Sequence, residues 1–262
     1  MIQQQEAILY EVKEHIAYVT LNRPEVLNCF NYSTLQKLGE VVEAIHHNGD
    51  VRVVIFTGAG AKAFSAGADL KERRTLSEND VKRNVKKIRD VFSAIEQLPQ
   101  PTIAAMNGHA FGGGFELALA CDLRVAVQAA SMGLTELGWA IIPGAGGTQR
   151  LPRLIGVPKA MELILTAKKL SAQEALAYGI LNKVTELDEL LPACEAYAAA
   201  ILKNGPIAVT QAKYAIKHGM DTDLHTGLAI EAKAYEVTIP TRDRIEALEA
   251  FSEKRPPQFK GE

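Results

Sequence analysis

The sequence predicts an α/β protein with a mainly parallel sheet, followed by a helical C-terminal region. Strand-like runs alternate with helical periods through the first two-thirds of the chain, as in proteins built from parallel strands. Beyond about Gly147 the strand signal fades and helical periods dominate. The 262 residues are 47% hydrophobic, which suits a large core with an appendage. We therefore expect residues 1–200 to form the core and residues 201–262 to form the helical region.

The first expected elements are two strands, a helix and a third strand. Residues 8–21 form the two strands, with a turn near Glu14, and Asn22-Arg23-Pro24 ends the second. Ser33 is the expected N-cap of the helix. Residues 51–57, Val-Arg-Val-Val-Ile-Phe-Thr, are mainly apolar and rich in β-branched residues, as in a buried strand. The helix is predicted from apolar residues at helical spacing: Leu35, Leu38, Val41, Val42 and Ile45.

The middle of the chain continues the alternation. A polar helix over residues 78–97 ends at Pro99 and is followed by a buried strand, Thr102–Met106. A helix begins near Glu116, and Leu123–Val127 reads as another strand. Further helices are expected over residues 160–165, 171–177, 187–203, 207–218 and 225–238, with an extended basic tail over 253–262.

Composition excludes several classes of protein. The formal charge of −2 does not favour nucleic acid or an anionic membrane as a partner. Cys29, Cys121 and Cys194 form no CxxC pair, so we expect neither a zinc site nor a disulfide framework. Residues 1–6 do not resemble a signal peptide, and no run of eighteen apolar residues suggests a membrane span. The expected location is the cytoplasm.

Two glycine-rich turns carry backbone amides suited to binding an anion. Residues 66–70, Ala-Gly-Ala-Asp-Leu, follow a strand, and Gly112-Gly113-Gly114 lies between a strand and a helix. If amides from both turns converge on one carbonyl oxygen, they form an oxyanion hole, in which one donor is worth about 3 kcal/mol of barrier. The alternative is that both are ordinary tight turns.

Two glutamates accompany these turns. Glu116 lies in the first turn of the helix after the glycines, where a carboxylate also favours the helix macrodipole. Glu136 lies in the apolar segment 133–138, where it is exposed, paired, or desolvated with a raised pKa. Together the two carboxyl groups can supply acid and base chemistry beside a carbonyl.

Other motifs point away from nucleotide cofactors. Residues 144–148, Gly-Ala-Gly-Gly-Thr, lack the ending of a P-loop, and residues 112–114 are not a dinucleotide fingerprint. His109 is interpreted as structural because no serine or cysteine nucleophile accompanies it. The basic run over residues 82–89 is either a solvated helix face or an anion-binding surface. Lys71 and Arg73, with Arg74, lie just after the first turn and are candidates for phosphate contacts.

Five motifs, in order, resemble the crotonase superfamily, and specifically the enoyl-CoA hydratases. They occupy residues 21–24, 64–70, 107–117, 142–151 and 170–175. The segment from Gly219 to Pro257 is most similar to the 3-methylglutaconyl-CoA hydratase branch, whose animal member also binds AU-rich RNA. In that member a lysine-rich helix contacts RNA. The matching residues 35–44 here hold one lysine and two glutamates, so RNA binding is not expected.

The resemblance implies a core of repeated ββα units, a helical trimerisation region, and a trimer or a dimer of trimers. It assigns the amides of Ala68 and Gly113 to the thioester carbonyl. Glu116 would hold and activate water, Glu136 would protonate the α-carbon, and the Gly144 amide would position the water. Coenzyme A contacts are expected from Ala66, Asp69, Leu70, Lys71, Tyr235 and Lys254. Glu25 stands where some hydratases have a nucleotide-binding lysine.

The activity that the resemblance implies is reversible syn addition of water to a trans-2-enoyl-CoA, which gives a 3-hydroxyacyl-CoA. No metal or cofactor is expected beyond the coenzyme A of the substrate. One alternative is an enoyl-CoA isomerase, which typically needs one carboxylate. A second is a 3-methylglutaconyl-CoA hydratase of leucine catabolism, for which Arg73, Arg74 and Lys82 are candidate ligands of the extra carboxylate. A third is an RNA-binding protein with secondary hydratase activity.

Overall fold

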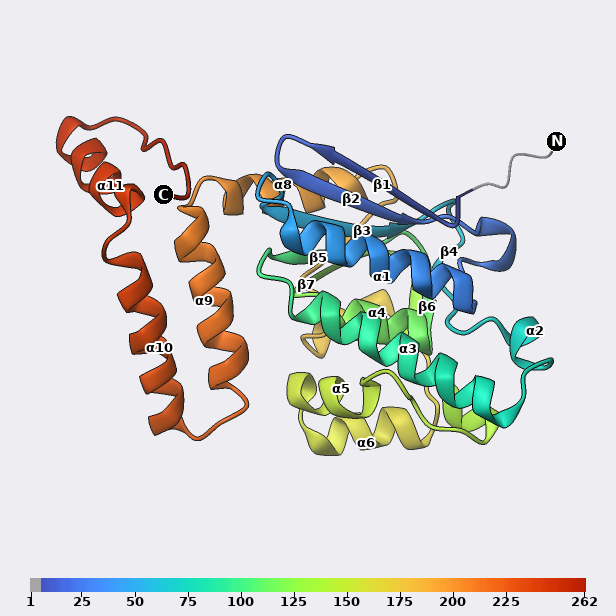
Figure 1. The fold of residues 1–262 in the computed structure, drawn as a ribbon. Coiled ribbons are helices and arrows are strands. Elements are labelled where there is room, and N and C mark those ends of the chain that lie inside the picture. Colours follow the sequence, from blue (N-terminus) through green and yellow to red (C-terminus); the bar gives the residue numbers. More distant parts are fainter. Residues whose placement is uncertain (1–5) are drawn as a thin grey trace. The chain divides into compact units, whose positions relative to one another are not determined.

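The larger of two sheets contains six strands and, apart from its first pair, is parallel. The computed structural model describes residues 6–262 (Figure 1). The strand order is β1-β2-β3-β5-β7-β10, and only β1 and β2 pair antiparallel. The strands are β1 Ile8–Lys13, β2 Ile16–Leu21, β3 Val53–Gly58, β5 Thr102–Met106, β7 Leu123–Val127 and β10 Lys183–Thr185. The predicted α/β class with mainly parallel pairing is thus confirmed.

A smaller sheet carries the loops that form the candidate site. Its order is β4-β6-β8-β9, with β4, β6 and β8 parallel and β9 antiparallel to β8. The strands are β4 Ala63–Ser65, β6 His109–Phe111, β8 Ser131–Gly133 and β9 Leu170–Ser171. Strands β9 and β10 correct the prediction that strands end near Gly147. Both are two or three residues long, too short to show an alternating pattern.

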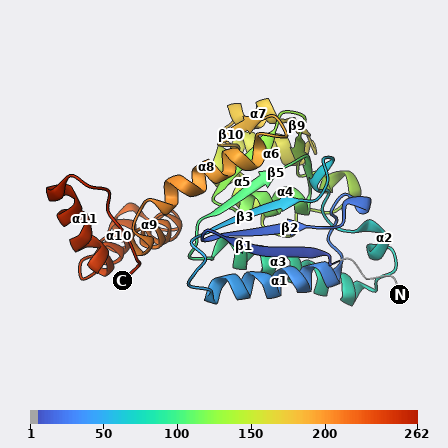
Figure 2. The ribbon, with the colours of Figure 1, turned by 90° about the horizontal axis from the view of Figure 1, so that it is seen from above.

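Helices α1 (Tyr32–His47) and α3 (Glu78–Glu96) run side by side (Figures 1 and 2). The α1 periodicity is confirmed, because its predicted apolar residues are buried. The predicted cap Ser33 is wrong. The N-cap is Asn31, whose side chain accepts a hydrogen bond from Thr34 N. In α3, Ile88 is one of four buried apolar residues.

Several shorter helices complete the first compact unit, whose described part covers residues 6–98 and Thr102–Glu195. Helix α4, Gly113–Ala120, is buried along its whole length. Ser171 caps α7 through a reciprocal capping box with Glu174, as its position in the sequence suggests. The helices are α2 Leu70–Arg73, α4 Gly113–Ala120, α5 Gly147–Ile155, α6 Val157–Leu165 and α7 Ala172–Ala177, with the start of α8 Leu190–Leu202.

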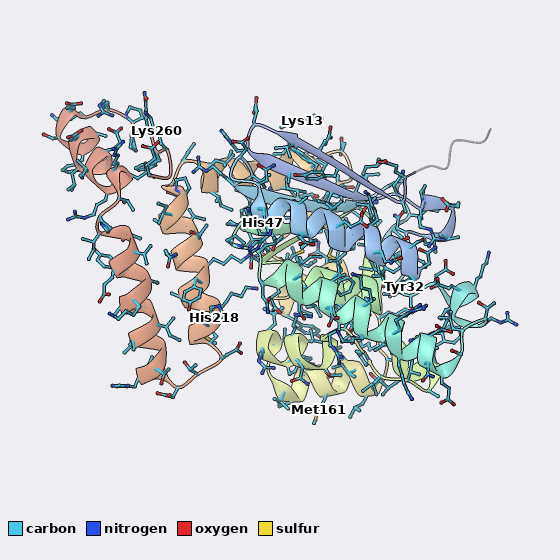
Figure 3. The ribbon with its side chains drawn as sticks, viewed as in Figure 1. Lys13, Tyr32, His47, Met161, His218 and Lys260 are labelled. Atoms are coloured by element: carbon cyan, nitrogen blue, oxygen red, sulfur yellow. The ribbon has the colours of Figure 1, made fainter. Side chains whose placement is uncertain are left out.

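The second unit comprises Pro99–Pro101 and Ala196–Glu262. Its helices α9 (Pro206–Gly219) and α10 (Leu224–Thr238) pack together, and α11 (Arg242–Glu253) follows. The tail forms no helix or strand but folds back on α11. Asp243 accepts hydrogen bonds from Lys260 N at 2.7 Å and Gly261 N at 2.9 Å. Figure 3 shows Lys260 in this tail, beside α11. The sequence predicted a core over residues 1–200 and a helical region over residues 201–262. That boundary stays a prediction.

The contact between α4 and β4 depends on Gly114. A β-carbon at this position would clash with the carbonyl oxygen of Ser65. We predict that Gly114→Ala lowers the free energy of unfolding by on the order of 3 kcal/mol, because a closely packed backbone has no room for the methyl group. Urea unfolding measures the change. Gly49→Ala is the matched control, since a β-carbon there meets nothing within 4 Å. Equal stability of both variants would contradict the packing argument.

Candidate active site

Three parallel strands deliver their following loops to one edge of the smaller sheet. Strands β4, β6 and β8 pair in parallel, so their carboxyl ends lie side by side. The loop after β4 contains Ala68, the turn after β6 leads to Gly113, and Glu136 follows β8. The amide of Gly112 donates to the carbonyl of Gly133 at 2.9 Å, which joins the second and third of these loops. Residues far apart in the sequence thus meet because of strand order.

The amide of Ala68 points away from the segment that holds its loop. Phe30 forms a parallel bridge to Ala68: its N–H donates to Gly67 O at 2.8 Å, and its carbonyl accepts from Asp69 N at 2.9 Å. In this pattern the intervening residue turns its own N–H to the opposite side. Within residues 6–262, the N–H of Ala68 has no hydrogen-bond acceptor.

The amide of Gly113 is a second unused donor. Gly113 is the first residue of α4, so its N–H has no partner within the helix, and none of the described residues accepts from it. A β-carbon at Gly113 would lie 3.9 Å from Ala68 N. Two free N–H groups from separate loops therefore lie close together, at the positive end of a buried helix.

Close approach of the two loops requires glycine at position 67. Gly67 has φ +90°, and a β-carbon there would lie 2.8 Å from Phe111 O and 3.0 Å from Gly113 N. A larger residue would push the loop after β4 away from α4. The glycine-rich character of this motif is therefore explained by the proximity of the two amides.

Glu116 is held by backbone amides of the loop before α5. Its side chain extends from the first turn of α4, and the residue is 3% exposed. Oε1 accepts from Ala145 N and Gly147 N, each at 2.8 Å. Burial raises the pKa of Glu116, while these two hydrogen bonds and the charge of Arg150 act to lower it. Oε2 accepts no hydrogen bond from residues 6–262.

Glu136 has no such support. It is half-buried at the start of the 3₁₀ helix η2, Glu136–Trp139, and within the described residues its buried Oε2 has no hydrogen-bond partner. Burial, and then the charge of Glu116, raise its pKa to about 7. A β-carbon at Gly112 would lie 3.2 Å from Glu136 Oε1, so the carboxyl group lies against the turn that precedes the Gly113 amide. The two carboxyl groups differ in environment, which separates their acidities.

Both glutamates and both free amides line one cavity of about 830 Å³. Of the site residues predicted from the sequence, seven line it: Ala66, Ala68, Leu70, Gly113, Glu116, Glu136 and Gly144. The sequence reasoning missed its apolar wall, which includes Val81, Val85, Ile88, Ile141 and Ile142. Val81, Val85 and Ile88 recur at helical spacing on the apolar face of α3. That spacing does not distinguish a core-facing helix from one that lines a cavity.

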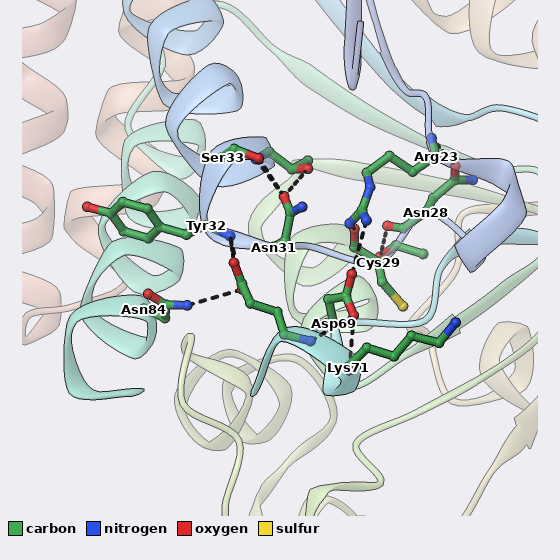
Figure 4. A network of polar contacts seen from close by, with 12 residues as sticks. Arg23, Asn28, Cys29, Asn31, Tyr32, Ser33, Asp69, Lys71 and Asn84 are labelled. Carbon is green, nitrogen blue, oxygen red and sulfur yellow. Dashed lines mark hydrogen bonds and ion pairs between the residues drawn. The ribbon is translucent and has the colours of Figure 1, made fainter. Parts of the chain in front are cut away.

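Four of the six predicted coenzyme A contacts lie outside the lining, and two of them, Asp69 and Lys71, belong to the start of α2. Asp69 is the N-cap of α2, accepting from Lys71 N and Glu72 N, and it forms an ion pair with Arg23 at 3.0 Å (Figure 4). Glu72 in turn accepts from Tyr32 N, at the start of α1, at 3.1 Å. These contacts position α2. A direct contact of Asp69 or Lys71 with coenzyme A stays a prediction.

The remaining predicted residues lie elsewhere. Tyr235 on α10 is 66% exposed, and Lys254 ends α11 with φ +56°, so both belong to the second unit. Their contact with coenzyme A stays a prediction. His109 does not line the cavity. Its Nδ1 accepts from Ser131 N at 3.1 Å and so joins β6 to β8, a structural contact.

The chain belongs to the enoyl-CoA hydratase/isomerase family, whose model matches residues 11–262. YngF of Bacillus subtilis (strain 168), which carries the family's enoyl-CoA hydratase/isomerase name, is 56% identical over 257 residues, covering 98% of this chain and 99% of that protein. The human mitochondrial methylglutaconyl-CoA hydratase is 48% identical over 260 residues, covering 97% and 76%. An enoyl-CoA hydratase crystal structure from Bacillus anthracis has a TM-score of 0.96 at 51% identity, covering 98% and 100%.

These likenesses confirm the crotonase resemblance and the predicted fold class, and the protein is an enzyme of this hydro-lyase family. Enzymes of the family act on acyl-CoA thioesters. No helix among residues 6–262 is long and apolar enough to cross a membrane. In the same part of the chain, no group of three or more His, Cys, Asp or Glu residues is arranged to hold a metal ion.

The raised pKa of Glu136 predicts a pH-dependent cost to stability. The folded protein binds a proton at Glu136 up to about pH 7, whereas the unfolded chain releases it near the ordinary value of 4.5. Stability is therefore lost as pH rises through this window. Glu136→Gln removes the effect, so its melting temperature relative to wild type should rise between pH 5 and pH 8. Exposed Glu162→Gln is the control. A difference that stays constant with pH would refute the desolvation of Glu136.

Proposed function

We propose that the protein catalyses reversible syn addition of water to a trans-2-enoyl-CoA, which gives a 3-hydroxyacyl-CoA. The observation that carries the proposal is the shared cavity, in which two carboxyl groups of different environment accompany two unused backbone amides. Such a set supplies a base, an acid and a site for negative charge. These are the three requirements for adding water to a double bond conjugated with a thioester.

In the proposed reaction the amides of Ala68 and Gly113 hold the thioester oxygen. Water attacks the β-carbon, and electrons move through the double bond onto that oxygen. The two N–H groups bind this enolate-like charge more strongly than the ground state, which lowers the barrier. The Gly144 amide, which lines the same cavity and is unused within the described residues, helps to position the water.

The two carboxyl groups divide the proton transfers. Glu116 is the base of the proposal and takes a proton from the attacking water: burial raises its pKa, but the amides of Ala145 and Gly147 and the charge of Arg150 act to stabilise the ionised form. Glu136 is protonated, because its pKa is raised and its buried oxygen has no donor among residues 6–262, and it gives its proton to the α-carbon. Proton exchange through the next water restores both groups. The mechanism uses no metal and no cofactor other than the coenzyme A of the substrate.

The rival activity in the family is isomerisation of the double bond. An isomerase moves one proton between two carbons and needs one carboxylate, which leaves the second glutamate without a role. The presence of both glutamates in one cavity favours hydration.

We predict that Glu116→Gln and Glu136→Gln each lower kcat for hydration of crotonyl-CoA by on the order of 10³-fold, because each removes one partner in proton transfer. Loss of absorbance at the conjugated thioester measures the rate. Both variants should stay folded, since glutamine has nearly the same shape. Glu162→Gln, on the exposed surface of α6, should keep the wild-type rate. Near-normal hydration by either active-site variant would sink the two-carboxylate mechanism.

A second candidate substrate is 3-methylglutaconyl-CoA, whose acyl chain ends in a carboxylate. The supporting observation is Arg73 of α2. It lines the cavity, forms no ion pair with any residue of 6–262, and is close enough to Glu136 for its charge to oppose the rise in that residue's pKa. An unpaired guanidinium in a mainly apolar cavity is suited to binding a carboxylate. Of the candidates named from the sequence, Arg74 and Lys82 do not line the cavity.

Arg73→Ala tests this substrate. We predict that it lowers kcat/KM for 3-methylglutaconyl-CoA relative to crotonyl-CoA by roughly 10- to 100-fold, the value of a charge-assisted hydrogen bond. The ratio of substrates removes any common effect on Glu136. Arg74→Ala, the exposed neighbour, is the matched control and should leave the ratio unchanged. If both variants keep the wild-type ratio, Arg73 does not bind the carboxylate of the acyl chain.

We further propose a homotrimer or a dimer of trimers in the cytoplasm. The second unit presents exposed large apolar side chains, among them Ile216, Met220, Leu224, Leu228 and Phe251. Such a surface is typical of a protein interface. RNA binding is disfavoured because the basic run on α3 is partly neutralised: Arg83 pairs with Asp80, and Lys86 pairs with Asp90.

A further inference from the structure

Arg150 connects the loop that holds Glu116 to helix α3. Its Nη1 donates to Ala145 O at 2.7 Å, and its Nη2 forms an ion pair with Glu96 Oε2 at 2.7 Å. The Arg150 side chain is 13% exposed and that of Glu96 is 32% exposed, so the ion pair is partly shielded from water. Gly146 makes room for the guanidinium: a β-carbon at this position, where φ is +107°, would clash with Arg150 Nη1.

The loop that Arg150 holds is the one that binds Glu116. Ala145 presents its carbonyl to Arg150 and its N–H to Glu116 Oε1, and Gly147 N donates to the same oxygen. The backbone of residues 144–147 is therefore held from both sides. Gly144, whose amide is assigned to the attacking water, begins this segment. A shift of the Ala145 carbonyl would move all three amides together.

We propose that Arg150 is a positioning residue for hydration: by holding the Ala145 carbonyl it fixes the amides that orient Glu116 and the attacking water. This inference rests on the proposed function. Arg150 does not line the cavity, so it acts through the loop and not on the substrate. Its ion pair with Glu96 fixes the guanidinium, since a planar guanidinium can serve two acceptors at once.

The charge of Arg150 adds a second effect that a purely structural contact lacks. It acts to lower the pKa of Glu116, against the raising effect of burial. Among residues 6–262, three other charged residues line the same cavity as Glu116, namely Glu136, Arg73 and Arg89, and the charges of Glu116 and Arg73 both act on Glu136. Four elements of the described chain pack closely on α4: β4 carries no charged residue, and His109 of β6 is turned to Ser131. Helix α3 contributes Arg89 to the cavity wall and Glu96 to the ion pair, and α5 carries Arg150 and the exposed Arg153. All these groups stay in place when only Arg150 is changed.

The test is the pH dependence of kcat for crotonyl-CoA in Arg150→Met, Arg150→Lys and a control. Arg150→Met should lower kcat by roughly 10- to 100-fold, the effect of a small misplacement of reacting groups. It should also move the acid limb of the profile to higher pH, because Glu116 becomes a weaker acid. Arg150→Lys keeps the charge, so its acid limb should stay near the wild-type position. Arg153→Met removes the exposed arginine one turn along α5 and should change neither quantity.

The outcomes separate the two proposals. If wild-type protein does not hydrate enoyl-CoA, the proposed function fails and this inference fails with it. If wild type is active and Arg150→Met matches Arg153→Met in rate and pH profile, only the positioning role is overturned. A lower melting temperature and lower kcat with an unmoved acid limb in Arg150→Met would reduce Arg150 to a structural contact. Should Arg150→Met not fold, Arg150→Lys decides. An acid limb that moves to higher pH in Arg150→Lys, although the charge is kept, would overturn the inference.

Discussion

The close approach of three parallel strand ends is the constraint on which the rest of the candidate site depends. Strands β4, β6 and β8 are short, and each is followed within three residues by Ala68, Gly113 or Glu136, which offer a free amide or a carboxyl group. Their loops can lie this close only where side chains are absent. Gly67 and Gly114 supply that space, because a β-carbon at either position would collide with the last carbonyl oxygen of a neighbouring strand, that of Phe111 or Ser65.

Two carboxyl groups lie in one cavity, and the fold stabilises their negative charges unequally. Burial raises the pKa of both, and the charge of Glu116 raises that of Glu136 further. Within residues 6–262, amides of another loop donate to one of the pair only: Ala145 and Gly147 donate to Glu116, whereas the only backbone amide that acts to lower the pKa of Glu136 is its own. The asymmetry is built from main-chain groups, whose positions are set by the loop before α5. This loop is in turn held by Arg150, which donates to the Ala145 carbonyl and pairs with Glu96. The charge of the same arginine acts to lower the pKa of Glu116.

The apolar wall of the cavity depends on a separate polar network. Helix α2 has four residues, none of them buried, so packing alone does not fix it. Asp69 caps it and pairs with Arg23, while Glu72 reaches the first amide of α1 and Asn84 of α3. Leu70 and Arg73, which line the cavity, are thereby held beside the apolar residues of α3. Polar contacts outside the cavity thus shape the space offered to an acyl chain.

Local pattern in the amino-acid sequence by itself determined many elements of this protein. Helical periodicity located α1 and α3, short and mainly apolar runs located β3, β5 and β7, and glycines marked the turns beside Glu116 and Glu136. Tertiary structure alone decided which of these features meet. Strand order brings residues 68, 113 and 136 to one edge, a relation that no spacing in the sequence encodes. It likewise placed Arg73 in the cavity lining, but not Arg74 or Lys82, and it showed the contacts of Arg150, to which sequence reasoning gave no role. It also formed β9 and β10 from segments too short to carry a pattern. The physical reason is that periodicity reports which side of an element is buried, whereas a site is formed by contacts between elements.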